Sequence, residues 1–250
     1  MTLDFLIEKM IGTGVLKTPR IIEAFRRVDR RAFVPKEYQD KAYIDEPLSL
    51  GFGSTISQPS TVAFMLELLA PAPGENILDI GSGSGWQTAL LAHIVSHDDF
   101  GRPLAPWNRP PASPAESFYS AGNSMGLAEK TCGHVVGLEH IPELAKESIS
   151  RLHQFSFITR GIAEIHAKNG EYGYPERAPY QAIIVAAGVR EVMPAWKEQL
   201  ASLGRLIFPK KWSIICMKKE ENGTFSEEQY EGYIFVPFIR EDDYDPDSID

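Results

Sequence analysis

The stretch that decides the fold is "NILDIGSGSGWQTALLAHIV", residues 76–95. An apolar run ends at Asp79, three glycines follow at Gly81, Gly83 and Gly85, and a helical pattern then begins. A strand that leads through a glycine-rich turn into a helix is typical of α/β units that bind nucleotides through the backbone of the turn. The pattern alone leaves open whether the ligand carries a pyrophosphate or no phosphate at all.

Strands and helices alternate on the carboxyl side of this stretch. After the strand at 76–80 we predict helices at about 85–95, from Pro142 onward and at about 194–200, and strands at 134–139, 163–167, 181–187, 205–209, 213–218 and 233–238. Alternation of this kind predicts an α/β fold with a doubly wound, mostly parallel sheet. The last two strands have no helix between them, so we expect added antiparallel strands at one edge.

Residues 1–50 are predicted to be helical and compact. Apolar residues recur at helical spacing from Leu3 to Ile11, and Thr18-Pro19 is typical of a helix start. Residues 51–58 are rich in glycine and hydroxyl groups, which indicates a loop, and Pro59 opens a helix that we expect to run through Leu69.

Composition excludes several classes of protein. The chain has 250 residues, two cysteines and a formal net charge of -9. This charge argues against broad nucleic-acid binding, and two cysteines exclude a disulfide scaffold. No apolar run approaches the roughly 18–20 residues of a membrane-spanning helix, and the first residues lack the pattern of a signal peptide. We therefore expect a cytoplasmic monomer that binds neither nucleic acid nor membrane, and the six histidines show no metal-binding spacing.

The glycine spacing and Asp79 favour a ligand without phosphate. A dinucleotide loop reads G-x-G-x-x-G, whereas this loop reads G-S-G-S-G and has an acid two residues before its first glycine. An acid at that point would repel a pyrophosphate and suits a cation such as S-adenosylmethionine. The alternative is that Asp79 only caps the turn.

Residues 96–132 interrupt the alternating pattern. They are rich in proline, serine, glycine and alanine, and connections between helices and strands are usually only two to six residues long. Glu139 is 54 residues beyond Gly85 (139 − 85), but an acid that binds ribose hydroxyls usually lies about 20 residues on. Removing an insertion of about 35 residues restores that spacing. The insertion is either a surface decoration or a lid near the ligand end of the sheet, with aromatic residues at Phe100, Trp107, Phe118 and Tyr119.

Several motifs outside the insertion are similar to those of one enzyme family. They are "FVPKEYQDKAY" (33–43), "GFGSTISQP" (51–59), "MLELL" (65–69), "LDIGSGSGWQTALLA" (78–92), "GLEHIPELA" (137–145), "APYQAIIVAA" (178–187), "QLASLGRLIFP" (199–209) and "FVPF" (235–238). Together they resemble the protein-L-isoaspartate O-methyltransferases. The glycine loop is shared by many methyltransferases, whereas "TISQP" (55–59) is much more specific.

The resemblance implies a Rossmann-like methyltransferase that uses S-adenosylmethionine to methylate the side-chain carboxylate of L-isoaspartyl or D-aspartyl residues in damaged proteins. It also implies which residues form the site. The catalytic candidates are Thr55 and Ser57, and Ser57 stands at the position of the family's active-site serine. The candidates for cofactor binding are Asp79, Gly81, Ser82, Gly83, Ser84, Gly85, Gln87, Thr88, Glu139, His140, Asn169 and Gly170, and no metal is expected.

The expected organisation is a single methyltransferase domain over residues 1–250. Its parts are an N-terminal helical and substrate-loop region (1–58), a cofactor-binding core (59–218) that contains the insertion at 96–132, and an edge strand with an acidic tail (219–250).

The chemistry of this reaction agrees with the residues of the "TIS" segment. An aspartyl carboxylate has a pKa near 4, so it is ionised at neutral pH and needs no general base. Catalysis should then come from alignment and from exclusion of water, with the Thr55 and Ser57 hydroxyls holding the carboxylate. The alternative for these hydroxyls is capping of the loop and of the helix that follows.

Three positions depart from the family pattern. Asn169 stands where the family usually has an acid near the adenine, Ser60 where it tends to have an aromatic residue or histidine, and Gln181 where it prefers aspartate. These departures leave open a methyltransferase for another peptide carboxylate, or a relative that binds S-adenosylmethionine without catalysis. A nicotinamide dehydrogenase is the remaining rival, and the glycine spacing argues against it.

Overall fold

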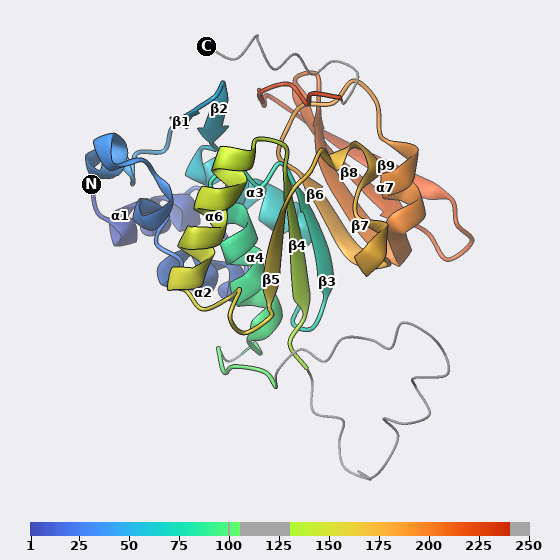
Figure 1. Ribbon diagram of the computed structural model, residues 1–250, viewed down its shortest axis with the longest axis horizontal. Helices are drawn as coiled ribbons and strands as arrows, with labels where there is room; N and C mark the ends of the chain where they lie inside the picture. Colours follow the sequence, from blue (N-terminus) through green and yellow to red (C-terminus); the bar gives the residue numbers. More distant parts are fainter. Residues whose placement is uncertain (100, 106–130, 241–250) are drawn as a thin grey trace.

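The computed structural model describes residues 1–99, 101–105 and 131–240 of the chain. Their centre is a seven-stranded sheet in the order β5-β4-β3-β6-β7-β8-β9 (Figure 1). The strands are β3 (Asn76–Ile80), β4 (His134–Glu139), β5 (Ala163–Ala167), β6 (Tyr180–Val185), β7 (Leu200–Lys210), β8 (Ser213–Lys219) and β9 (Phe225–Glu231). Neighbouring strands from β5 to β7 are parallel, whereas β8 and β9 pair antiparallel at one edge. The predicted fold class is confirmed.

The strand order places a ligand site at the centre of the sheet. The chain passes from β3 outward to β4 and β5, and then crosses to the other side of β3 to form β6. Such a reversal opens a crevice at the carboxyl ends of the strands, because the connections on its two sides diverge. The glycine loop, which directly follows β3, lies at this point.

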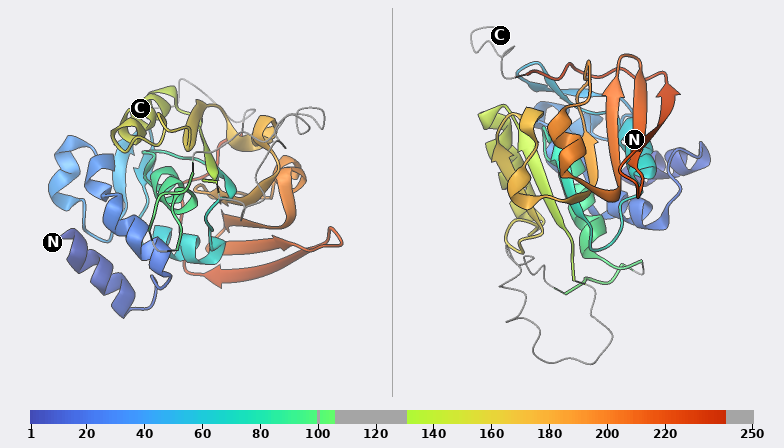
Figure 2. Two further views of the ribbon diagram at one scale, coloured as in Figure 1. Left: turned by 90° about the horizontal axis from the view of Figure 1, so that it is seen from below. Right: turned by 90° about the vertical axis from the view of Figure 1, so that its right-hand side faces the viewer.

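Helices cover both faces of the sheet. One face packs against α3 (Pro59–Leu69), α4 (Trp86–Ser96) and α6 (Pro142–Gln154), and α1 (Leu3–Gly12) and α2 (Pro19–Arg27) extend this layer. The other face packs against α7 (Pro194–Gln199). Adjacent residues of β3 belong to opposite layers, since Ile77 lies in the first hydrophobic cluster and Leu78 in the second. This alternation is the pleat of a strand that is buried on both sides. Figure 2 shows the β8–β9 hairpin at the outer edge of the sheet.

Short elements complete the N-terminal part. The 3-10 helices η1 (Arg30–Phe33) and η2 (Lys36–Lys41) precede a hairpin of β1 (Leu48–Gly51) and β2 (Ser54–Ile56), which occupies part of the predicted 51–58 loop. The predicted helix from Pro59 to Leu69 is confirmed as α3. Two further 3-10 helices, η3 (Gly170–Tyr172) and η4 (Pro175–Arg177), connect β5 to β6.

The predicted strand at 233–238 is wrong. The last strand of the sheet is β9, at Phe225–Glu231, and residues 233–238 run on as an extended segment with one isolated bridge between Gly188 and Pro237. The sequence of β9, "FSEEQYE", is polar because it is a largely exposed edge strand, so it lacks an apolar signal. The apolar residues of 234–238 instead line a pocket.

The described ends of the insertion do not lie near the ligand end of the sheet, where the lid hypothesis expects them. Helix α4 runs back from the glycine loop, so its end and the start of β4 lie at the amino ends of the strands (Figure 1). The described ends of the segment meet there, where Ala105 bridges Thr131 and accepts the N–H of Cys132 at 2.8 Å. The four aromatic residues named for the lid lie outside the described residues, as does the acidic tail after 240.

None of the described helices combines the length and the apolarity that crossing a bilayer requires.

Candidate functional site

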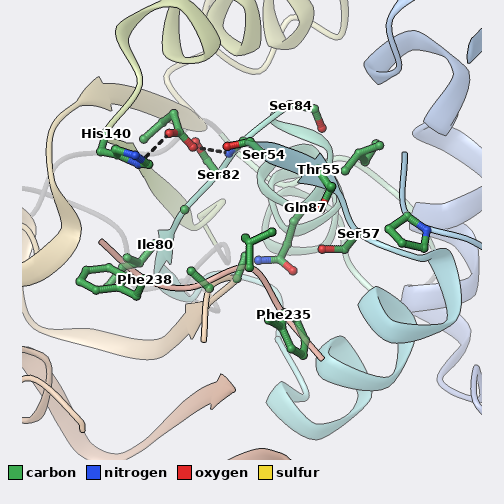
Figure 3. Close-up of a pocket in the computed structure, with 18 of the residues that line it drawn as sticks. Ser54, Thr55, Ser57, Ile80, Ser82, Ser84, Gln87, His140, Phe235 and Phe238 are labelled. Atoms are coloured by element: carbon green, nitrogen blue, oxygen red, sulfur yellow. Dashed lines mark hydrogen bonds and ion pairs between the residues drawn. The ribbon is translucent and has the colours of Figure 1, made fainter. Parts of the chain in front are cut away.

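A cavity of about 660 Å³ lies at the carboxyl ends of β3, β4 and β6 (Figure 3). Three segments enclose it: the glycine loop, the stretch from the β1–β2 hairpin to the start of α3, and the C-terminal segment from Ile234 to Ile239. Eleven of the fourteen predicted site residues line it: Thr55, Ser57, Gly81, Ser82, Gly83, Ser84, Gln87, Glu139, His140, Asn169 and Gly170. The other three, Asp79, Gly85 and Thr88, do not line the cavity and lie behind the residues that do.

The glycine loop needs its glycines for backbone reasons. Gly81, Gly83 and Gly85 have φ values of 80°, 51° and 84°, in the left-handed region that side chains disfavour. Gly85 is also packed tightly, because a Cβ there would lie 2.7 Å from Leu152 Cδ1. The turn is fixed to the neighbouring strand by two N–H groups, from Gly81 and Ser82, that donate to the carbonyl oxygen of Leu138 at 2.8 and 3.0 Å.

Asp79 supports the pocket from behind. Its side chain is fully buried and accepts hydrogen bonds from the Thr88 hydroxyl at 2.6 Å and from Gln87 Nε2 at 2.7 Å. Burial raises the pKa of Asp79 to about 6, against the lowering effect of these two donors. Asp79 is therefore neither in contact with the cavity nor a cap of the turn, and it orients Gln87, which does line the cavity.

Glu139 is the acid that faces the cavity. It ends β4, and its carboxylate accepts the N–H of Gly83 at 2.8 Å and the N–H of Ile141 at 2.9 Å. His140 Nδ1 lies 3.2 Å from the same carboxylate (Figure 3). These contacts fix a buried carboxylate beside the glycine loop, at the position where an acid for ribose hydroxyls is expected.

Ser57 and Thr55 contribute hydroxyls from the opposite wall. In Figure 3 the Ser57 hydroxyl points toward the interior of the pocket, and Thr55 lies farther out on β2. Neither hydroxyl forms a hydrogen bond with another described residue. The helix-capping alternative is wrong for both, because the first turn of α3 is instead held by Asp45, which accepts the N–H of Ser60 at 2.9 Å.

Asn169 joins two walls of the cavity. Its Oδ1 accepts the N–H of Glu171 at 2.9 Å, and its Nδ2 donates to the carbonyl oxygen of Ile239 at 3.0 Å. An aspartate could make only the first of these bonds. Gln181, which also departs from the family pattern, forms a hydrogen bond in the structure. Its Oε1 accepts the N–H of Asn76, the first residue of β3, at 2.8 Å.

The polar lining suits a cationic ligand without phosphate. The described residues that line the cavity include no lysine or arginine, and Glu139 supplies a carboxylate. The hydroxyl of Ser82 is buried in this lining and has no hydrogen-bond partner among the described residues, so it can bond a polar ligand atom. Apolar surface from Ile80, Ala186 and Phe238 lies nearby. These residues fit S-adenosylmethionine, and they include no positively charged side chain that could pair with a pyrophosphate.

Sequence reasoning missed two parts of the site. The apolar pattern around the "FVPF" motif predicts a strand, whereas these residues form the C-terminal wall of the cavity. The second part is Arg30, which is buried and donates to the carbonyl oxygen of Ser57 at 3.1 Å. The segment around Arg30 reads "DRRAFVP", with two adjacent arginines before an apolar segment, and this pattern does not reveal which guanidinium is buried.

The comparisons with known proteins agree with this geometry. The sequence profile of the protein-L-isoaspartate(D-aspartate) O-methyltransferase family matches residues 1–100 and 120–243. The chain belongs to this family. Among similar members is a protein-L-isoaspartate O-methyltransferase from Aeropyrum pernix, 34% identical over 97% of this chain and 81% of that protein. Another, from Methanopyrus kandleri, is 32% identical over 97% of this chain and 94% of that protein.

Solved structures of the family share the fold. A putative protein-L-isoaspartate O-methyltransferase from Plasmodium falciparum, in complex with S-adenosyl-L-homocysteine, has a TM-score of 0.70 and 21% identity over 93% of this chain and 96% of that one. A second protein-L-isoaspartate O-methyltransferase has a TM-score of 0.72 and 24% identity over 94% of this chain and 65% of that one.

Proposed function

We propose that this protein transfers a methyl group from S-adenosylmethionine to the side-chain carboxylate of L-isoaspartyl, or D-aspartyl, residues in damaged proteins. One observation carries the proposal: the Ser57 hydroxyl and the glycine loop with Glu139 line the same cavity. The family to which the chain belongs, and the names of its relatives, support this substrate and this cofactor.

Each part of the cavity has a role in holding the cofactor. Glu139 is placed to accept hydrogen bonds from ribose hydroxyls, and the Ser82 hydroxyl is free to bond a polar atom. Gln87, oriented by Asp79, offers an amide to the cavity, and Phe238 lies on the apolar side together with Ile80. S-adenosylmethionine supplies an electrophilic methyl group on a cationic sulfur.

The reaction requires positioning rather than proton transfer. The substrate carboxylate is ionised at neutral pH, so its oxygen forms the new bond to the methyl carbon while the carbon–sulfur bond breaks and its electron pair goes to sulfur. Ser57, with Thr55 farther out, donates hydrogen bonds that orient the carboxylate. Alignment of the two reacting atoms and removal of water supply the rate enhancement.

Radiolabelled methyl transfer tests the proposal. A peptide with an isoaspartyl residue should be methylated, and the same peptide with a normal aspartyl residue should not. The variant Ser57→Ala should lose on the order of tenfold or more in kcat, while its Kd for S-adenosylhomocysteine in calorimetry stays within about twofold.

Two other outcomes identify the alternatives. Methylation of a different carboxylate peptide alone would indicate another substrate, and tight cofactor binding without transfer to any of these peptides would indicate a non-catalytic relative. The single-domain division, the monomeric state and the cytoplasmic location remain predictions from the sequence.

A further inference from the structure

Arg30 is a buried cation at the start of η1 that bonds only backbone oxygens. Its side chain is 0% exposed. Its Nη1 donates to the carbonyl oxygens of Ala42 at 2.8 Å and Ile44 at 3.3 Å, and its Nη2 donates to those of Glu46 at 3.0 Å and Ser57 at 3.1 Å. One guanidinium thus joins the segment before the β1–β2 hairpin to the segment that carries the Ser57 hydroxyl.

This cation has no acidic partner in direct contact. None of the described carboxylates forms an ion pair with Arg30, although the charge of Asp45 acts on it from a distance. Burial lowers the pKa of Arg30 to about 10, so the side chain still carries its charge at neutral pH. A buried charge without an opposite charge is costly unless its donors form hydrogen bonds. Here both Nη atoms donate to several carbonyl oxygens, whereas the buried Nε has no partner among the described residues.

The guanidinium also contacts Trp86, which lies next to the glycine loop. It lies over the ring of Trp86, 5.5 Å from the ring centroid. Trp86 is the first residue of α4, directly after the glycine loop, and it lines the cavity. Its indole N–H donates to the carbonyl oxygen of Val28 at 3.1 Å, and its ring packs edge-on against Phe25. Arg30 therefore lies between the Ser57 peptide and the element that holds the cofactor loop.

We propose that Arg30 is a positioning residue for methyl transfer, which fixes Ser57 relative to the glycine loop by holding the Ser57 carbonyl oxygen against the Trp86 side of the pocket. The inference rests on the proposed function, because it concerns the orientation of the substrate carboxylate. A planar fork with several donors can serve carbonyl oxygens from two segments at once, which a lysine ammonium cannot reproduce. A shift of about 1 Å at Ser57 would misalign the carboxylate with the methyl carbon and reduce the rate by up to about a hundredfold.

The variant Arg30→Lys tests this role. It keeps a positive charge but loses the fork, so kcat for an isoaspartyl peptide should fall on the order of tenfold or more, and the Kd for S-adenosylhomocysteine should stay within about threefold. The matched control is Arg205→Lys, because Arg205 is a partly buried arginine that bonds Glu75 at 2.6 Å near the amino ends of the strands. Its kcat should equal that of the wild type.

A double-mutant cycle shows whether Arg30 acts through Ser57. In a Ser57→Ala background, Arg30→Lys should reduce kcat by less than about threefold, because the hydroxyl that Arg30 positions is already absent. A general loss of structure would instead reduce kcat by the same factor in both backgrounds, which would overturn the proposal.

The lysine ammonium of Arg30→Lys could prevent folding, because it would be buried. The variant Arg30→Gln serves in that case, since its neutral amide can still donate to two carbonyl oxygens. If both variants lose S-adenosylhomocysteine binding, Arg30 is a requirement of the whole fold and the proposal is wrong. It is also wrong if a folded variant keeps kcat within about threefold of the wild type. Absence of isoaspartyl methylation by the wild-type protein would refute the proposed function instead.

Discussion

Asn169 Nδ2 donates a hydrogen bond of 3.0 Å to the carbonyl oxygen of Ile239. This bond connects the second residue after β5 with the C-terminal wall of the cavity, 70 residues farther along the chain. Beside it, Arg240 contacts Glu171 at 2.8 Å. The side chains of Asn169 and Glu171 therefore hold the end of this C-terminal wall in place.

The variant Asn169→Asp should loosen this wall. A carboxylate cannot donate to the Ile239 carbonyl and repels it, so the backbone N–H groups of residues 233–239 should exchange with deuterium roughly five- to tenfold faster. Hydrogen-exchange mass spectrometry measures this directly. The control is Asn76→Asp, which makes the same chemical change where Nδ2 donates to the carbonyl oxygens of Arg177 and Pro179. Unchanged exchange at 233–239 in Asn169→Asp would contradict the role assigned to this bond.

The buried carboxyl of Asp79 should make stability depend on pH. Its pKa is about 6 in the folded protein against 3.8 ordinarily, so the folded state binds the extra proton between these values. The free energy of unfolding therefore falls as pH rises from about 4 to about 6, and this contribution is constant above about 7.

Urea unfolding of the wild type and of Asp79→Asn at pH 4, 5, 6 and 7 isolates this effect. Relative to the variant, the wild type should lose up to about 3 kcal/mol of stability across the series. A difference between the two proteins that stays constant with pH would show that Asp79 does not titrate in this range.

Glu164 should show the opposite dependence. Burial opposes its ionisation, but hydrogen bonds and charges from His134 and Arg177 outweigh burial and hold its pKa well below the ordinary range. Arg177 Nε lies 2.8 Å from its carboxylate. The stabilisation is therefore complete above about pH 4.5 and is lost as pH falls below that value.

The variant Glu164→Gln should lose about 1–3 kcal/mol of stability at pH 7. The loss should shrink in acid, which chemical unfolding at pH 7 and pH 3.5 would reveal. Glu228→Gln is the control, because Glu228 forms an exposed ion pair with Lys218, and its unfolding midpoint should not change. An equal loss at both pH values would argue against a depressed pKa at Glu164.

Replacing residues 106–130 with a short glycine–serine linker should preserve the fold. Ala105 and Thr131 already bridge each other, so few residues are needed to close the connection. These anchors lie at the amino ends of the strands, away from the cavity. The Kd for S-adenosylhomocysteine should therefore stay within about twofold, and a larger loss would revive the lid hypothesis.

The sequence predicted the features that local chemistry and strand order determine. The glycine loop was recognisable because its turn needs positive φ, and Glu139 because it ends the strand next to β3. The side-chain direction of Asp79 was not predictable, since it depends on Gln87 and Thr88 in the first turn of the next helix. The role of Arg30 was hidden for a similar reason, because its partners are carbonyl oxygens, and any residue type can supply those.

The packing of Gly170 has a consequence for the ageing of the molecule. A Cβ at Gly170 would lie 2.3 Å from Ile80 Cγ2, so the residue after Asn169 must be glycine. Asn-Gly is the dipeptide whose asparagine most readily cyclises to a succinimide and reopens as isoaspartate. In the fold this reaction is restrained, because both ends of the Asn169 amide are bonded. The protein thus carries in its own cofactor pocket the kind of site whose damage it is proposed to repair, and only its folded state protects that site.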